Sequence, residues 1–289
     1  MFGSVVVGIG TAGLVRIRDM LAPLPSSAAE KLSVKGFISR RILEEQQGVK
    51  QITVEDALSR DDIKVAFVCT ENAAHEENIR MFLEAGKHVC VEYPMAMTHK
   101  TAVDLWDLAQ EKGVVLHEEH IELLTADFKQ LKKDVAGKRL EEGFLHFTGG
   151  PLKPGFGFPA FSGIARLTWL VDLFGELSVT MTAQLITKEQ KYVLFLSQRL
   201  KPSYSEWAPG LPRAKDINFR FDSCTITQLP PATREPVGIF MQDLVLFSQK
   251  LLGQVPRDQL HAERRRVLHC LELADRIQQL SLKGSAQDA

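Results

Sequence analysis

The stretch VVVGIGTAG, residues 5–13, decides the fold of the N-terminal part of the chain. Three valines lead into the pattern GxGxxG. Its first glycine allows a tight turn, its second lets backbone amides approach a pyrophosphate, and its third lets the next helix pack close to the strand. We expect this turn to bind a dinucleotide through Gly8, Ile9, Gly10, Thr11, Ala12 and Gly13. A glycine turn that only joins a strand to a helix is the alternative.

The residues up to position 120 repeat this strand-and-helix arrangement, which weighs against that alternative. The short apolar runs VKGFIS, VAFVCT, HVCVEYP and VVLHEEH indicate the strands of a parallel sheet that is covered on both faces. Two amphipathic stretches between them have the ends of helices, with Asn72 and Thr98 as N-caps and Gly86 and Gly113 as C-terminal stops. The sequence thus predicts a Rossmann dinucleotide-binding domain over residues 1–120.

Beyond residue 120 the pattern changes to longer strand-like runs with few helices between them. The runs GFLHFTGG, SVTMTAQLIT, KYVLFLSQRL, INFRFDS and CTITQLP indicate an antiparallel sheet. One helical stretch, GIARLTWLVDLFGEL, interrupts them, and two more close the chain. The overall fold class is therefore α/β, with a second, α+β domain over residues 121–289 that carries a large, mainly antiparallel sheet.

The composition of the chain indicates a small-molecule partner. Its 35 basic and 36 acidic side chains balance, so we expect neither nucleic acid nor a membrane as a partner. The four cysteines form no CxxC pair, which favours reduced thiols and the cytosol. The apolar run SVVVGIG is too short for a signal segment or a membrane span. We expect a cytoplasmic monomer whose mature chain begins at or near Met1.

The end of the second predicted strand indicates which dinucleotide is bound. An NAD-selective site usually has an acidic residue there for the ribose hydroxyls, whereas this chain has Ser39, Arg40 and Arg41. An arginine offers a planar, permanently charged fork that suits a 2′-phosphate. We therefore expect NADPH to be preferred and NADH to bind more weakly. The alternative is that both arginines are solvated surface charges.

Residues 68–97, VCTENAAHEENIRMFLEAGKHVCVEYPMAM, carry a resemblance to a known family. The motif Thr-x-Asn-x-x-His, followed by Ala-Gly-Lys-His and Glu-x-Pro, resembles the core of the Gfo/Idh/MocA oxidoreductases. The resemblance implies cofactor contacts at Asn72, Ala73, Ala74, His75 and Tyr93.

Two departures set the chain apart from the polyol-oxidising members of that family. Tyr93 stands where those members have a lysine near the nicotinamide. Phe161 and Ala165 stand where they have an aspartate and a histidine, and neither replacement can move a proton. The site is therefore not built to deprotonate a carbinol. Arg166 is left as the prominent charge on an apolar helix.

Several further stretches resemble the tetrapyrrole-reducing branch of the family, and the likeness covers nearly the full length. They are GFISRR, FGFPAFSGIARLTWLVDLFGEL and RRRVLHCLELADRIQ. That branch delivers hydride from NADPH or NADH to the central methine carbon of biliverdin IXα, giving bilirubin, and the resemblance implies the same reaction and biliverdin as the partner here. One alternative is a sugar or inositol dehydrogenase of the wider family. Another is a non-catalytic, NADPH-binding interaction protein.

A flat, conjugated substrate with two propionates needs apolar walls and a few cations. We expect Phe158 and Phe161 to supply walls, and Lys153 and Arg166 to meet carboxylates or developing charge. The proton for the pyrrole nitrogen has several candidate sources. Arg166 would position a proton-carrying water or a propionate, and Tyr93 could donate or only orient the reactants.

Carboxyl groups are the remaining candidates for proton transfer. Glu92, Glu119 and Glu122 could act if desolvation raises their pKa values, and we rank them below Arg166 and Tyr93. The predicted catalytic residues are Arg166, Tyr93 and Glu92.

We predict no metal site. The histidines of HEEH, residues 117–120, are three apart in a strand-like context, which suits joint ligation badly. His269 and Cys270 match half of a zinc motif found in relatives, but Ser281 and Leu282 stand where that motif has two thiolates.

Overall fold

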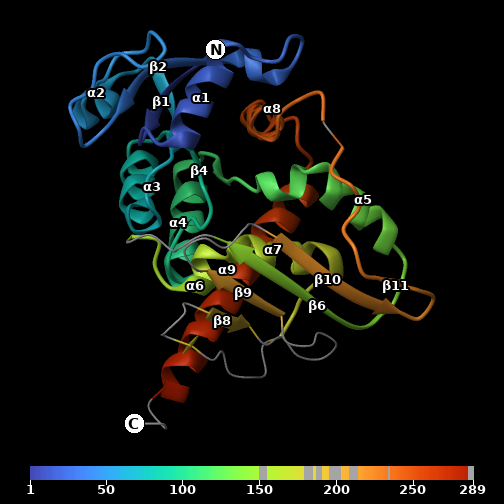
Figure 1. Ribbon diagram of the computed structural model, residues 1–289. Helices are drawn as coiled ribbons and strands as arrows, with labels where there is room; N and C mark the ends of the chain where they lie inside the picture. The colour runs from blue at the N-terminus through green and yellow to red at the C-terminus, as the bar shows by residue number, and fades with distance from the viewer. Residues whose placement is uncertain are drawn as a thin grey trace. The chain divides into compact units, whose positions relative to one another are not determined.

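The computed structural model describes residues 1–149, 155–178, 185–186, 191–194, 203–207, 214–233 and 235–285. They form two compact units. The first consists of residues 1–124 and 235–263, and the second of the described residues of 125–234 and 264–289. Each unit has its own β-sheet (Figure 1).

The first unit is built on a five-stranded parallel sheet in the order β2-β1-β3-β4-β5. Its strands are β1 (Phe2–Val7), β2 (Leu32–Ile38), β3 (Ile63–Val68), β4 (His88–Val91) and β5 (Leu116–Glu118). Val5, Val65 and Val89 have no exposed surface, as expected for a parallel sheet that is covered on both faces. The predicted Rossmann fold is confirmed.

Helices and short 3₁₀ turns connect these strands. The helices are α1 (Thr11–Leu21), α2 (Val54–Ser59), α3 (His75–Glu84) and α4 (His99–Lys112), and the turns are η1 (Ala28–Lys31), η2 (Asn72–Ala74) and η3 (Ile121–Leu124). Helices α3 and α4 pack side by side (Figure 1).

The ends of two helices test the predicted caps. The Thr98 hydroxyl accepts a hydrogen bond from the backbone amide of Thr101 at 3.1 Å, and Gly113 ends α4 in the left-handed conformation, so both predicted caps are confirmed. Gly86, with φ of +68°, follows the end of α3 in the same way. The prediction of Asn72 as N-cap was wrong, because its buried side chain belongs to the turn η2 and α3 begins only at His75.

Helix α8 (Ile239–Leu251) belongs to the first unit although it lies far along the chain. Leu244 and Phe247 have no exposed surface and pack in one core with Val6. The rings of Phe247 and Phe67 meet edge to face, with centroids 5.5 Å apart. The predicted division after residue 120 places α8 in the second domain, whereas its apolar face is buried against the first sheet.

The second unit holds a six-stranded sheet in the order β11-β10-β6-β9-β8-β7. Its strands are β6 (Leu140–Gly149), β7 (Leu185–Ile186), β8 (Lys191–Leu194), β9 (Ser203–Trp207), β10 (Ala214–Phe221) and β11 (Thr225–Ile226). Every neighbouring pair is antiparallel except β6 with β9, so the predicted sheet is confirmed. The sequence did not predict β9, because SYSEW contains no continuous apolar run.

The helices of the second unit are α5 (Ala126–Val135), α6 (Pro159–Ser162), α7 (Ile164–Phe174) and most of α9 (Arg257–Ser285). Residues 164–171 of α7 are all buried, which makes it the central helix of this unit. The Trp169 ring packs at 4.7 Å between centroids against Phe128 of α5.

Candidate active site

The glycine turn after β1 has the geometry that its sequence predicted. Gly8 has φ of +95°, in the left-handed region that favours glycine. A Cβ on Gly13 would lie 2.1 Å from the carbonyl oxygen of Gly8, so only glycine lets α1 approach the turn this closely. A Cβ on Gly10 would meet no described atom within 4 Å. The turn is therefore packed against the protein at residues 8 and 13 and open at residue 10.

The start of α1 suits an anion. Gly10 is the N-cap, and within the described chain no side chain caps this end of the helix or places an acidic group in its first turn. Uncapped amides at the positive end of a helix dipole attract phosphate. Together with the open space at Gly10, they fit the pyrophosphate of a dinucleotide.

The three residues after β2 stand at the same edge of the sheet as the glycine turn. The Ser39 hydroxyl accepts a hydrogen bond from the backbone amide of Arg41 at 3.1 Å. The exposed Arg40 guanidinium makes a two-pronged ion pair with Glu71, with nitrogen–oxygen distances of 2.8 and 3.1 Å. Arg40 is therefore engaged by a carboxylate, and its predicted role at a 2′-phosphate stays a prediction.

His75, at the start of α3, holds two backbone segments together. Its Nδ1 lies 2.8 Å from the carbonyl oxygen of Pro94, and its Nε2 lies 3.0 Å from that of Thr70. The ring has no exposed surface, and burial lowers its pKa. His75 thus ties the end of β3 to the turn after β4, and its predicted contact with a cofactor stays untested. The neighbouring predicted contacts are the buried Asn72, the exposed Ala73 and the partly exposed Ala74.

Tyr93 lies in that turn after β4, joined to Pro94 by a cis peptide bond. The backbone amide of Met95 donates a hydrogen bond to Glu118 at 2.6 Å. The His120 ring lies parallel to the Tyr93 ring, with centroids 6.3 Å apart, and its Nε2 is 3.1 Å from Glu118. Glu118 and His120 are both buried, so the turn that carries Tyr93 is supported by fixed side chains.

Two carboxyl groups near this turn have raised pKa values. Burial raises the pKa of Glu92, against the opposing effects of a hydrogen bond with Cys69 and the charge of Arg16. Burial raises the pKa of Glu119 to about 8, although Arg16 acts to lower it. Glu92 and Glu119 were considered as acids on the condition that desolvation raises their pKa values, and burial does raise both.

The segment HEEH, residues 117–120, places its side chains on alternate sides. Glu118 and His120 meet the Tyr93 turn, while His117 and Glu119 join a buried polar network. We define this network as Arg16, His117, Glu119, Asp243, Lys250 and Glu263, all buried in the first unit. Arg16 of α1 donates to Glu119 and to Asp243 of α8.

His117 links the two halves of the network. Lys250 lies 2.7 Å from its Nδ1 and also donates to Glu263. Nδ1 also lies 3.2 Å from a carboxylate oxygen of Glu263, and Nε2 lies 2.9 Å from a carboxylate oxygen of Asp243, so the ring contacts three charged side chains of the network. Burial alone would raise the pKa of Asp243, but Arg16 and His117 outweigh it and hold that pKa well below its usual range.

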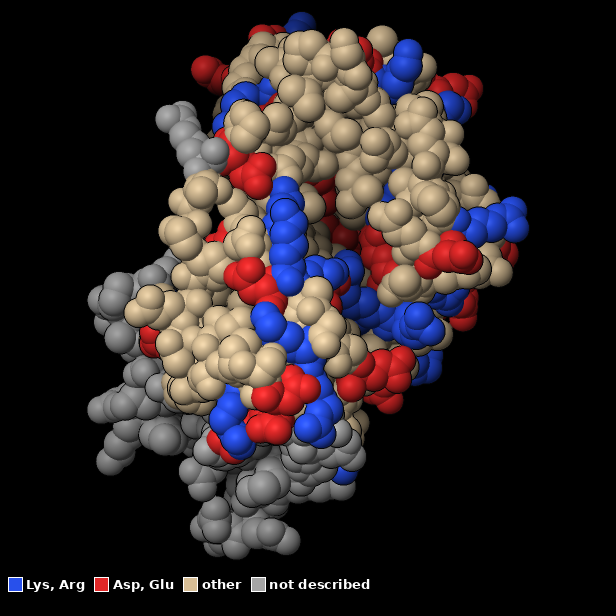
Figure 2. Space-filling view, turned by 90° about the vertical axis from the view of Figure 1, so that its right-hand side faces the viewer, with Lys and Arg blue, Asp and Glu red and all other residues tan. Residues whose placement is uncertain are grey.

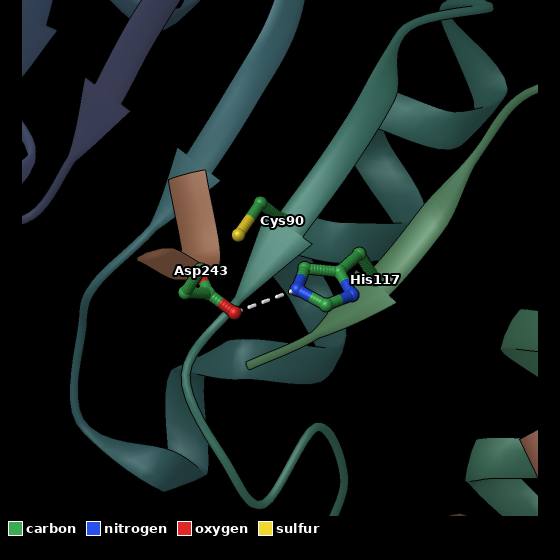
Figure 3. Close-up of side chains that lie close together, drawn as sticks. All are labelled: Cys90, His117 and Asp243. Atoms are coloured by element: carbon green, nitrogen blue, oxygen red, sulfur yellow. Dashed lines mark hydrogen bonds and ion pairs between the residues drawn. The ribbon is translucent and has the colours of Figure 1, made fainter. Parts of the chain in front are cut away.

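Cys90, His117 and Asp243 bring three possible metal ligands within 4.8 Å of one another (Figure 3). Burial raises the pKa of the Cys90 thiol, which disfavours the thiolate that a metal needs. Within the network, Arg16 already pairs with Asp243, and Lys250 already pairs with Glu263. A divalent cation would add two uncompensated charges to this balanced, buried group. The absence of a metal site stays a prediction, and these charges support it.

In the second unit, Arg166 of α7 is buried beside an aromatic ring. Its Cζ lies 3.5 Å from the centroid of the Phe147 ring of β6, at cation–π distance. Phe161 is fully buried in α6, which favours packing over an exposed pocket wall, whereas Phe158 is partly exposed. Lys153 lies outside the described residues. These substrate contacts stay predictions.

The predicted absence of zinc near the C-terminus concerns α9. His269 Nε2 accepts a hydrogen bond from the backbone amide of Leu177 at 3.0 Å, and Cys270 is buried. The Ser281 hydroxyl donates to the carbonyl oxygen of Ile277 at 2.9 Å. Both the histidine nitrogen and the serine hydroxyl have structural partners, which agrees with that prediction without testing it.

Comparison with known proteins identifies the family. A model described as an oxidoreductase family with an NAD-binding Rossmann fold matches residues 2–120, and one described as biliverdin reductase, catalytic, matches residues 128–233. The chain is 50% identical over 284 residues to biliverdin reductase A from Homo sapiens, which covers 96% of this chain and 95% of that one. The chain belongs to the biliverdin reductase family. The biliverdin reductase A of Mus musculus is likewise 50% identical, over 286 residues and 96% of each chain.

A solved member of the biliverdin reductase group shares the fold. The crystal structure of biliverdin reductase from Synechocystis sp. PCC 6803, in complex with biliverdin and NADP⁺, matches with a TM-score of 0.81. The match covers 96% of this chain and 98% of that one at 22% sequence identity, a level that shows the fold alone.

The surface charge of this biliverdin reductase family member is mixed. Figure 2 shows Lys and Arg side chains interspersed with Asp and Glu over the described part of one face. Among the described residues, no helix has both the length and the apolar character needed to cross a membrane.

Proposed function

We propose that this protein is an NADPH-dependent biliverdin reductase that reduces the central methine bridge of biliverdin IXα to give bilirubin. NADH serves as a weaker cofactor, and the protein acts as a cytoplasmic monomer. The observation that carries the proposal is the 50% identity to biliverdin reductase A over 96% of the chain. The match of residues 128–233 to the catalytic family model supports the substrate side.

Residues of the first unit hold the dinucleotide in this proposal. The open turn at residues 8–13 receives the pyrophosphate, and Arg40 and Arg41 meet the 2′-phosphate. The nicotinamide, when bound, supplies the hydride. Tyr93 presents a neutral phenol from its supported turn. A phenol can stack on or hydrogen-bond to a conjugated substrate, whereas an ammonium group suits sugar hydroxyls.

The second unit supplies the charge for the substrate. Arg166 stays protonated at any working pH, so it anchors a propionate or a water and is not itself the acid. Its position over Phe147 places that charge on an apolar, aromatic surface of the kind that a bilin needs. The proton for the pyrrole nitrogen comes from Tyr93 or from the carboxyl of Glu92, whose pKa is raised by burial.

Spectroscopy tests this proposal directly. Purified protein with biliverdin and NADPH should lose the red absorption of the verdin and gain the blue band of bilirubin. Arg166→Ala should lower turnover by about 100-fold, an ordinary loss for a charge that acts in the transition state, and change NADPH affinity less than about twofold. Arg220→Ala is the matched control, because Arg220 is an exposed arginine of the same unit that pairs with Glu141. No colour change with NADPH binding intact would refute the proposal.

Two other functions give different outcomes in the same experiment. Turnover of inositol or a sugar with NADP⁺ would indicate a polyol dehydrogenase, against which the buried, non-ionisable Phe161 and Ala165 already weigh. Tight binding of NADPH with no turnover of any bilin would indicate a non-catalytic interaction protein.

A further inference from the structure

An acidic residue does lie near the end of β2, but it comes from the segment that follows β3. The sequence offers only Ser39, Arg40 and Arg41 there, but Glu71, 31 positions beyond Arg40, lies against the Arg40 guanidinium. Both carboxylate oxygens take part, at 2.8 and 3.1 Å. Two prongs of the arginine fork therefore bind a carboxylate of the protein itself.

The strand order explains why this pair forms. Ile38 of β2 and Val68 of β3 both lie opposite Val7 of β1, so the two strands that flank β1 end level with the start of the glycine turn. Arg40 follows one of these strands by two residues, and Glu71 follows the other by three. The ion pair joins the two strand ends that flank residues 8–13, the edge at which a dinucleotide binds in this fold.

We propose that Glu71 determines how strongly the protein prefers NADPH over NADH; this rests on the proposed function, which includes both cofactors. A 2′-phosphate must draw Arg40 away from Glu71 and leaves a dianion near that carboxylate. A 2′-hydroxyl, in contrast, can donate a hydrogen bond to Glu71 while the ion pair stays closed. Glu71 therefore lowers the affinity for the phosphorylated ribose and leaves that for the unphosphorylated ribose nearly unchanged.

The exposure of the pair sets the size of this effect. The Arg40 side chain is 86% exposed and that of Glu71 is 29% exposed, so the pair is weak enough for a ligand to open. Opening the pair costs part of the binding free energy of the 2′-phosphate, and the screened repulsion between Glu71 and the phosphate dianion costs a comparable part. Together they correspond to about threefold to tenfold in affinity.

The test measures binding of ribose fragments, without nicotinamide, biliverdin or turnover. Calorimetry with 2′,5′-ADP and with 5′-AMP should show that Glu71→Gln raises the affinity for 2′,5′-ADP by about threefold to tenfold and changes that for 5′-AMP less than twofold. Glu71 makes no side-chain cap in η2, so the variant should fold, and thermal unfolding checks this. In an Arg40→Ala background, Glu71→Gln should have a clearly smaller effect.

Glu76→Gln is the matched control, because it removes the same charge from an exposed pair with Arg80 in the same unit. It should leave both affinities within twofold. The proposal is overturned if Glu71→Gln changes both fragments equally, if Glu76→Gln has the same effect, or if the effect of Glu71→Gln is undiminished without Arg40. Failure of biliverdin turnover would overturn the proposed function and leave this binding result standing.

Discussion

Replacing Arg16 with methionine should destabilise the protein strongly, because Arg16 is a central cation of the buried polar network. Its side chain is 1% exposed and donates to Glu119, Asp243 and the carbonyl oxygen of Phe240. Methionine keeps much of the volume and removes every one of these bonds. Glu119 can remain protonated, but the ionised Asp243 keeps only His117 as its hydrogen-bonded partner within the network.

The size of the loss follows from the burial of Asp243. Removing one partner of a buried ion pair costs about 3–5 kcal/mol, and the remaining bond to His117 favours the lower end, about 3 kcal/mol. The melting temperature should fall by about 6 °C or more. Urea unfolding followed by circular dichroism at pH 7 measures the loss. Arg80→Met is the control in the same unit, because Arg80 pairs with Glu76 and both side chains are exposed, and it should lose less than about 1 kcal/mol.

Acidification gives an independent check on Arg16→Met. Asp243 has a depressed pKa in the folded protein, so it contributes stability above its unfolded pKa and loses that contribution as the pH falls. The deficit of Arg16→Met against the wild type should therefore shrink between pH 7 and pH 3. Equal losses for Arg16→Met and Arg80→Met at pH 7, or a deficit that does not change with pH, would refute the reasoning.

Three further changes test separate features. Glu119→Gln should gain stability relative to the wild type as the pH rises to about 8. The raised pKa of Glu119 gives the wild type a stability that is fully present below the unfolded value near 4.5 and is lost as the pH rises through the folded value. Urea unfolding at pH 5, 7 and 9 measures the difference, and the absence of a trend would show that the pKa is not raised. Gly13→Ala should disrupt the turn and lower the melting temperature, whereas Gly10→Ala should keep the wild-type melting temperature and bind NADP⁺ more weakly. Equal melting temperatures for the two variants would contradict the packing argument. Lys87→Met should cost about 2–3 kcal/mol in urea unfolding, because the buried Lys87 ammonium donates to the carbonyl oxygens of Arg60 at 3.0 Å and Ile63 at 2.7 Å, and a loss below 1 kcal/mol would argue against that role.

Local chemistry made much of the fold predictable. The glycine spacing at residues 8–13 and the caps at Thr98 and Gly113 depend on backbone conformation and on hydrogen bonds within a few residues, and the structure confirms them. The cap at Asn72 was wrong because burial of the segment that leads into α3 prevails over a local capping bond. An amphipathic pattern likewise shows that α8 buries one face, but not which sheet that face covers.

The sequence by itself determined the Rossmann turn, the replacement of a family lysine by Tyr93 and the family resemblance, because each of these is a matter of residue type and short-range spacing. Only the tertiary structure decided that Arg40 pairs with Glu71, that Arg16 binds Asp243 of α8, and that HEEH serves two different sets of contacts. The physical reason is that an ion pair or a buried hydrogen bond depends on which strands and helices lie side by side. The order of strands in a sheet follows from the packing of the whole unit, and no short stretch of sequence encodes it.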